Sequence, residues 1–141
     1  MIYLPDVNVW IALTSNRHVH HAIATEWLHG IEQDFVAFCR VSELGFLRLQ
    51  TNSHVMGSDV LSPTQAWRIY DEWRADGRVI FLSERTNFSE QWRQLGNQIS
   101  GGANAWTDAY LAAFAEESSA TVITLDRAFR SLGKAAIIPL V

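Results

Sequence analysis

The chain consists of short apolar runs separated by longer segments in which apolar residues recur with helical spacing. The runs predict five strands, at residues 1–4, 35–39, 78–82, 121–125 and 136–138. The segments between them predict helices at residues 7–13, 21–30, 43–49, 62–76, 87–99 and 105–117, and a short helix at 128–132. Strands that are apolar on both faces and alternate with helices indicate a parallel sheet covered on both sides. The pattern therefore predicts the α/β class, a three-layer α/β/α fold with a central, mostly parallel sheet of about five strands.

Residues with special backbone preferences set the expected boundaries of these elements. Ser42 and Asn104 are placed to cap the helices that follow them, and Pro63 lies in a predicted first turn. Pro5 cannot donate to a sheet ladder, so we expect the first strand to end at about residue 4 or 5.

Composition narrows the class of protein. At 141 residues, 48% hydrophobic and 18% charged, the chain is of a size and make-up typical of one globular domain. No stretch approaches the ~20 apolar residues of a membrane helix, and no signal-peptide pattern opens the chain. The single cysteine, Cys39, excludes an internal disulfide and a multi-cysteine zinc site. We therefore expect a cytoplasmic protein with no membrane partner.

The charge pattern gives a mixed indication about nucleic acids. The net charge of −4 is unusual for a nucleic-acid binder, yet ten of the eleven basic residues are arginine, which suits bidentate contact with phosphate. Any one arginine can also be a solvated surface residue. Five of them lie near the acidic motifs in sequence: Arg17, Arg40, Arg48, Arg127 and Arg130.

Four acidic residues stand at the places where an α/β chain positions its chemistry. Asp6 and Asp126 each follow a predicted strand directly, and Glu43 and Asp108 lie near the start of predicted helices. In an open α/β sheet, ligands bind beyond the carboxyl ends of the strands. We therefore expect the four carboxylates to converge on one edge of the sheet.

Such a cluster is costly unless a cation joins it, because neighbouring carboxylates repel and some take up protons. Mg²⁺ or Mn²⁺ accepts oxygen ligands while keeping several waters, and can lower the pKa of a bound water near a phosphate. The cluster therefore indicates phosphodiester hydrolysis.

Each acid also has an ordinary structural interpretation. Asp6 could cap the helix after the first strand, and Asp108 could complement a helix dipole. Asp126 could be a turn residue, and Glu43 could simply begin a helix.

The acidic segments resemble the motifs of PIN-domain nucleases, especially the VapC-like toxins of bacterial toxin–antitoxin pairs. The segments LPDVNVWIAL, SELGFLRLQTN, TDAYLAAFA and TVITLDRAF occur in the family's order over nearly the whole chain. The resemblance implies one PIN-like nuclease domain over residues 1–141, acting as an endoribonuclease with Mg²⁺ or Mn²⁺. It also implies an RNA substrate, a cognate antitoxin protein and a homodimer.

The resemblance assigns roles by position. Asp6, Glu43 and Asp108 would be the core metal ligands, and Asp126 the more variable fourth acid. Two features depart from the family pattern: Pro5, where an ordinary strand residue is commoner, and the acidic net charge.

Further residues are candidates for supporting roles. Asn8 matches the polar position after the first aspartate, and Thr124 matches a strand-end position that often bears a hydroxyl, although it also fits an ordinary strand residue. The candidate substrate contacts are Arg17, Arg40, Arg127 and Trp106. Trp10 could also stack on a base, although core packing is an alternative for both tryptophans.

Other patterns leave alternatives open. His18, His20 and His21 could be zinc ligands, but no CxxC or HExxH pattern accompanies them. The aromatic residues of segment 62–76 suit the core or an interface. The alternative functions are an aspartate-based phosphoryl-transfer domain, of receiver or phosphatase type, and a non-catalytic PIN-like module that binds RNA or protein.

Overall fold

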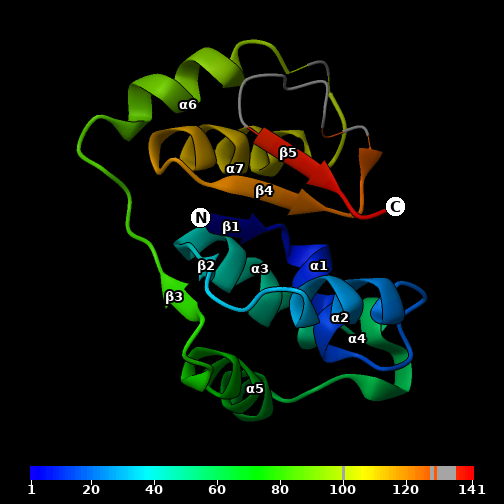
Figure 1. Cartoon of the computed structure of the whole chain (residues 1–141). Helices are drawn as coiled ribbons and strands as arrows, with labels where there is room; N and C mark the ends of the chain where they lie inside the picture. The colour runs from blue at the N-terminus through cyan, green and yellow to red at the C-terminus, as the bar shows by residue number, and fades with distance from the viewer. Residues whose placement is uncertain (100, 128, 130–135) are drawn as a thin grey trace.

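A five-stranded parallel sheet runs through the centre of the computed structural model, which describes residues 1–99, 101–127, 129 and 136–141 (Figure 1). The strands lie in the order β3-β2-β1-β4-β5, and each neighbouring pair is parallel. They are β1 (Ile2–Pro5), β2 (Phe35–Phe38), β3 (Val79–Phe81), β4 (Thr121–Thr124) and β5 (Ala136–Pro139). The predicted α/β class and parallel sheet are confirmed.

The helices follow the predicted order, with two short additions. The main helices are α1 (Val7–Thr14), α2 (His21–His29), α3 (Arg40–Gln50), α5 (Pro63–Ala75), α6 (Phe88–Gly96) and α7 (Ala105–Glu117). Two short pieces, α4 (Ser53–Met56) and the 3₁₀ turn η1 (Gly57–Asp59), occupy a stretch in which no helix was predicted. The helix predicted at 128–132 lies outside the described residues.

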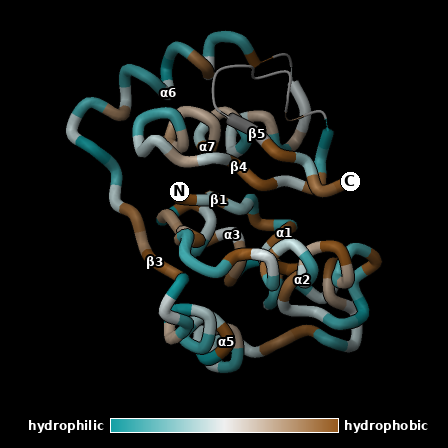
Figure 2. Tube along the Cα trace, in the orientation of Figure 1, coloured by the Kyte–Doolittle hydropathy of each residue, from teal (hydrophilic) through white to brown (hydrophobic). Residues whose placement is uncertain are grey.

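Two apolar clusters, one on each face of the sheet, hold the layers together. Ala37 and Val122 pack with α6 and α7, whereas the strand residues next to them, such as Phe38 and Ile123, pack with α1, α2 and α5. Alternate residues of one strand point to opposite faces, so strands that are apolar throughout can serve both clusters. Figure 2 shows hydrophobic strands β3 and β4 between α5 and α6, whose turns are largely hydrophilic.

The sheet order places the ends of β1 and β4 side by side. Pro5 lies opposite Ile123 in the register, and the N–H of Asp6 extends the pairing by donating to the Ile123 carbonyl at 2.9 Å. The proline is therefore accommodated at the last position of a central strand. The residues that follow β1 and β4 emerge together at the carboxyl edge.

One predicted helix cap differs from the observed one, and a second is confirmed in position but not in its side-chain contact. The N-cap of α3 is Cys39, not Ser42, and the Ser42 hydroxyl lies inside the first turn, where it accepts the Cys39 N–H at 3.0 Å. A side chain three residues into a helix can satisfy the N-cap N–H in this way. Asn104 is the N-cap of α7, but its side chain makes no capping hydrogen bond to the described residues of the helix.

Gly45 allows α3 to pack closely against α1. A Cβ at this position would lie 2.6 Å from Cγ2 of Val7, which is closer than carbon atoms can approach. The close contact brings the helix after β2 against the helix after β1, and so brings Glu43 toward the edge where Asp6 lies. Among the described residues, no helix has the length and apolar character that spanning a membrane would require.

Candidate active site

Asp6 lies where β1 ends and α1 begins, and only 7% of it is exposed. Its Oδ1 accepts the N–H of Val9 at 3.1 Å, so it does cap α1. Burial raises the pKa of Asp6, while hydrogen bonds from Thr124, Val9 and the backbone of Asn8 oppose the rise. The side chain of Asn8 is itself exposed. Asp6 is therefore a buried carboxylate whose ionised form a nearby cation would stabilise.

Thr124, the last residue of β4, links two of the four acids. Its Oγ1 donates to Oδ2 of Asp6 at 2.5 Å and accepts the backbone N–H of Asp126 at 2.9 Å. The side chain is fully buried. One hydroxyl therefore orients the Asp6 carboxylate and fixes the backbone that carries Asp126.

The first turn of α7 brings Asp108 into the electric field of the same acids. The pKa of Asp108 is raised to about 6, by burial first and then by the negative charges of Asp6 and Asp126. The charge of Asp126, which is exposed after β4, also raises the pKa of Asp6. The three aspartates therefore share one electrostatic environment at the carboxyl edge of the sheet.

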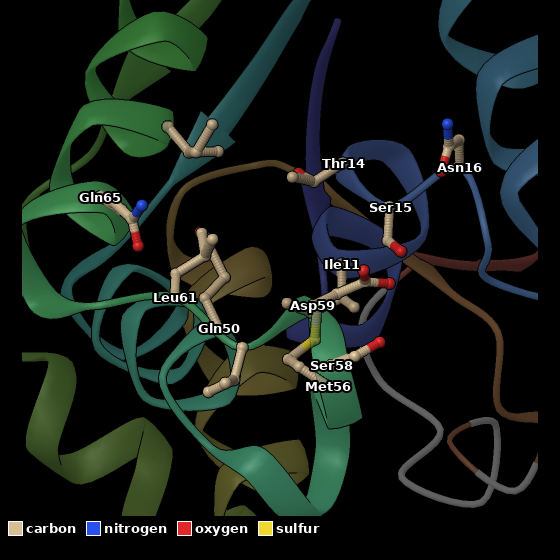
Figure 3. Close-up of a pocket in the computed structure, with 12 residues that line it drawn as sticks. Ile11, Thr14, Ser15, Asn16, Gln50, Met56, Ser58, Asp59, Leu61 and Gln65 are labelled. Atoms are coloured by element: carbon tan, nitrogen blue, oxygen red, sulfur yellow. The ribbon is translucent and has the colours of Figure 1, made fainter.

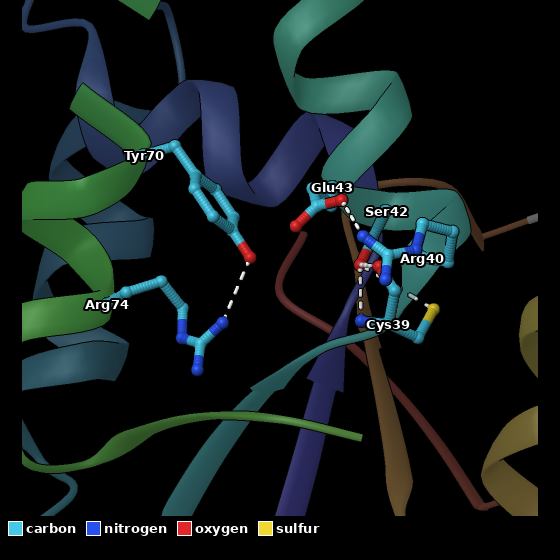
Figure 4. Close-up of polar contacts among 6 residues, drawn as sticks. All are labelled: Cys39, Arg40, Ser42, Glu43, Tyr70 and Arg74. Carbon is cyan, nitrogen blue, oxygen red and sulfur yellow. Dashed lines mark hydrogen bonds and ion pairs between the residues drawn. The ribbon is translucent and has the colours of Figure 1, made fainter. Parts of the chain in front are cut away.

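Glu43, in the first turn of α3, has cationic neighbours. NH1 of Arg40 donates to its Oε1 at 2.5 Å, and NH1 of Arg74 donates to the hydroxyl of Tyr70 at 3.1 Å (Figure 4). The pKa of Tyr70 is raised to about 12, by burial first and then by the adjacent Glu43 carboxylate. Glu43 therefore lies between a guanidinium and a phenol that belong to this chain.

The geometry does not form a closed metal site. Within the described parts of the chain, no three His, Cys, Asp or Glu side chains are arranged so that they could hold a metal ion. The chemistry of the donors nevertheless fits a hard divalent cation, because buried carboxylates that repel one another are stabilised when a cation accepts their oxygens.

The two remaining candidate arginines are occupied elsewhere. Arg17 pairs with Asp59 of η1 at 3.6 Å, and Nε of Arg127 donates to the carbonyl oxygen of Val141 at 2.7 Å. Both side chains are exposed. Among the hydrogen bonds of the described residues, Arg40 is the one arginine candidate that contacts any of the four acids.

The two tryptophans near the acids occupy opposite environments. Trp10 is fully buried and stacks on Phe38 with ring centres 3.9 Å apart, so it belongs to the core. Trp106 is 63% exposed and lies over α6, where a Cβ on Gly96 would come within 3.0 Å of its ring. It also lines a surface hollow of about 310 Å³. Trp106 is therefore accessible to a ligand, two residues before Asp108.

The histidine cluster organises the turn between α1 and α2. Nδ1 of His18 accepts the N–H of His20 at 3.0 Å, and Nδ1 of His21 lies 2.7 Å from the carbonyl oxygen of Ala12. The pKa of His18 is lowered by burial and then by the charges of the other two histidines. These contacts show an architectural role for the cluster.

A separate hollow of about 470 Å³ opens between α1, the region of α4 and η1, and α5 (Figure 3). Its lining includes Thr14, Met56 and Leu61, and none of the four acids. Gln50 also lines it, and the buried amide of this residue has no hydrogen-bond partner among the described residues. This hollow is therefore distinct from the acidic edge.

Tyr70 and Arg74 are the site residues that sequence reasoning missed. They lie four residues apart in α5 and so share one helix face, which is a detectable signal. Nothing in the sequence, however, indicates that this face meets Glu43. The contact depends on how α5 packs against α3.

Known proteins match the chain in sequence and in fold. The family model described as PIN domain matches residues 3–135. Ribonuclease VapC41 of Mycobacterium tuberculosis (strain CDC 1551 / Oshkosh) is 37% identical over 135 residues, which cover 92% of each chain. Ribonuclease VapC38 of M. tuberculosis (strain ATCC 25618 / H37Rv) is 30% identical over 87% of this chain and 84% of its own.

Solved structures share the fold at low sequence identity. VapBC-1 from nontypeable Haemophilus influenzae aligns with a TM-score of 0.70 at 18% identity, covering 99% of this chain and 98% of the other. The M. tuberculosis VapC20 toxin, described as cleaving the sarcin–ricin loop, aligns with a TM-score of 0.69 at 16% identity, covering 99% of this chain and all of the other. The sequence matches show that the chain belongs to the PIN-domain family and, within it, to the VapC ribonucleases.

Proposed function

We propose that this chain is a Mg²⁺- or Mn²⁺-dependent endoribonuclease that hydrolyses RNA phosphodiester bonds as the toxin of a toxin–antitoxin pair. The observation that carries the proposal is the similarity to VapC ribonucleases over nearly the full length. The shared electrostatic environment of Asp6, Asp108 and Asp126 supports it, because a divalent cation would offset the repulsion between these neighbouring carboxylates. On this proposal, residues 1–141 act as one nuclease domain.

The metal would be held by Asp6, Glu43, Asp108 and Asp126. When bound, a divalent cation supplies Lewis acidity and lowers the pKa of a coordinated water. The protein's own part is to position the ligands. Thr124 fixes the orientation of Asp6, and the first turn of α7 holds Asp108 where the charge of Asp6 acts on it.

Glu43 would contribute differently from the aspartates. Its Oε1 already accepts a hydrogen bond from Arg40, so a positive group of the protein lies next to this carboxylate even without a metal ion. Arg40 therefore supplies a positive charge at this carboxylate from within the protein.

The proposed partners follow from the family. Solved neighbours include VapBC2 from Rickettsia felis bound to a DNA fragment from its promoter, and VapBC-1 from H. influenzae. We therefore propose a cognate antitoxin as protein partner, RNA as substrate, the cytoplasm as location and a homodimer as the assembled form. Family membership also favours the nuclease over a receiver-like or phosphatase-like domain.

The test is cleavage of a total RNA pool by the purified chain. With Mg²⁺ or Mn²⁺ present, we expect cleavage by the unaltered protein, and loss of at least about 10²-fold in rate in Asp108→Asn or in excess EDTA, because metal stabilisation of transition-state charge contributes several kcal/mol. Asp71→Asn, an exposed charge on α5, is the matched control and should cleave normally.

Two results would contradict the proposal. Undiminished cleavage in EDTA would exclude the metal mechanism. RNA binding without any cleavage, under conditions in which divalent metal is bound, would instead favour the non-catalytic module.

A further inference from the structure

The chain carries a net charge of −4 and gathers acids at its candidate active site, yet its proposed substrate is a polyanion. Binding to RNA draws much of its free energy from cations that neutralise phosphates. Local positive charge beside the acids is therefore required. The described residues supply it next to Glu43, through Arg40 and Arg74.

Both guanidinium groups lie beside the same aromatic ring. The Cζ atom of Arg40 is 4.8 Å, and that of Arg74 5.6 Å, from the centre of the Phe81 ring at the end of β3. Arg74 also lies 5.9 Å from the ring centre of Tyr70. Two like charges therefore sit close together on aromatic faces, which attract cations. We call Arg40 and Arg74 the Phe81 arginine pair.

Each guanidinium is anchored through one nitrogen. Arg40 uses NH1 to reach Glu43, and Arg74 uses NH1 to reach the Tyr70 hydroxyl. A guanidinium has five N–H donors in a planar fork, so the described contacts leave most of them for a ligand. Both residues are exposed.

Anchoring reduces the entropy that these arginines would lose on binding a ligand. A flexible arginine loses side-chain entropy when it binds, whereas one already held against rings and a hydroxyl loses less. The Arg40–Glu43 ion pair is by contrast a weak stabiliser of the fold, because 72% of the Arg40 side chain is exposed. The arrangement therefore suits ligand binding better than structural support.

We propose that the Phe81 arginine pair binds the RNA backbone phosphates next to the scissile bond, on the Glu43 side of the acidic edge. This inference rests on the proposed ribonuclease function. It makes Arg74, from α5, a substrate-positioning residue of the nuclease, and it explains how an acidic protein holds a polyanion beside its own carboxylates.

The test measures RNA binding in a protein that cannot cleave. In an Asp108→Asn background with Mg²⁺ present, the anisotropy of a fluorescein-labelled poly(U) oligonucleotide is followed over a series of salt concentrations. Each phosphate contact contributes about 0.7 to the slope of log affinity against log salt for a single strand. We expect Arg74→Gln and Arg40→Gln each to lower that slope by about 0.7, and the double variant by about 1.4.

Arg68→Gln is the matched control. It removes the same charge from the same helix, two residues before Tyr70 and so on another side of α5. Its slope should equal that of the background protein. In the cleaving protein, Arg74→Gln should raise KM with little change in kcat, because it removes binding that substrate and transition state share.

The outcomes separate the two proposals. If RNA binds and is cleaved, but Arg74→Gln and Arg40→Gln share the slope of Arg68→Gln, the arginine pair has been wrongly assigned; a role in holding an acidic partner peptide would give this result. If the unaltered chain neither binds nor cleaves RNA, the ribonuclease proposal fails, and the phosphate assignment fails with it.

Discussion

The carboxylates on the two sides of the acidic edge have different electrostatic surroundings. On the aspartate side, which consists of Asp6, Asp108 and Asp126, burial and then the charges of neighbouring acids raise the pKa of Asp6 and of Asp108. On the glutamate side, Glu43 is met by Arg40 and lies beside Tyr70, which accepts a hydrogen bond from Arg74. Asp6 is held by neutral donors, the Thr124 hydroxyl and the Val9 N–H, whereas Glu43 already has a guanidinium beside it.

This difference indicates that the two sides bind different ligands. Buried carboxylates that repel one another gain most from a divalent cation. Arginines anchored beside a carboxylate, with donors left over, gain most from a phosphate. We therefore expect metal binding to depend chiefly on the aspartate side and substrate binding on the glutamate side.

The largest expected effect in testing this division comes from Thr124→Val. The change removes the hydroxyl that donates to Asp6 and accepts from Asp126, at almost constant volume. Loss of a group that orients a metal ligand typically costs 10–100-fold, so we expect kcat/KM for RNA to fall by roughly that factor. Thr124→Ser, which keeps the hydroxyl, should retain most of the activity.

A second control separates function from stability. Thr121→Val changes another buried threonine of β4, three residues earlier, and should leave cleavage intact. The salt slope of RNA binding should be unchanged in Thr124→Val, because the glutamate side is untouched. Cleavage by Thr124→Val at the unaltered rate would show that the hydroxyl does not orient the site.

The fold was predictable to the extent that strong local patterns fix it. The β-branched run at 121–125 and the Ala-rich segment at 105–117 correspond to β4 and α7, because buried strands and a buried helix leave continuous apolar runs. The short pieces α4 and η1 were missed, since their residues carry no periodic apolar pattern and 51–53 reads as a turn.

The site was predictable only in part, for a related reason. Strand-end position alone places Asp6 next to Thr124 and Asp126, because parallel strands end at a common edge. The contact between Tyr70 and Glu43 depends on the packing of α5 against α3, which local sequence does not encode. Trp10 and Trp106, both close to an acid in sequence, prove to be a core and a surface residue, respectively.

The smallest expected effect is on the way the free energy of unfolding of the metal-free protein changes with pH. The pKa of Asp108 is about 6 in the folded chain against 3.8 ordinarily, so the folded state binds more protons between these values. Stability should therefore fall as pH rises from about 4 to about 6, and stay level above that as far as this group is concerned. Allowing for solvent screening at a half-buried site, the change is on the order of 1 kcal/mol.

Urea denaturation in EDTA at pH values across this window measures the effect. Asp108→Asn should show a smaller decline than the unaltered protein and should be at least as stable at pH 7. An equal decline in the two proteins would mean that Asp108 titrates normally and is not crowded by Asp6 and Asp126.

The most direct test of the division between the two sides is calorimetric titration of Mn²⁺ into the RNA-free protein. Binding by the unaltered chain should be lost or greatly weakened in Asp108→Asn, and should be retained in Arg74→Gln and in the Asp71→Asn control. If Asp108→Asn binds Mn²⁺ as tightly as the unaltered chain, the aspartate side is not the metal site.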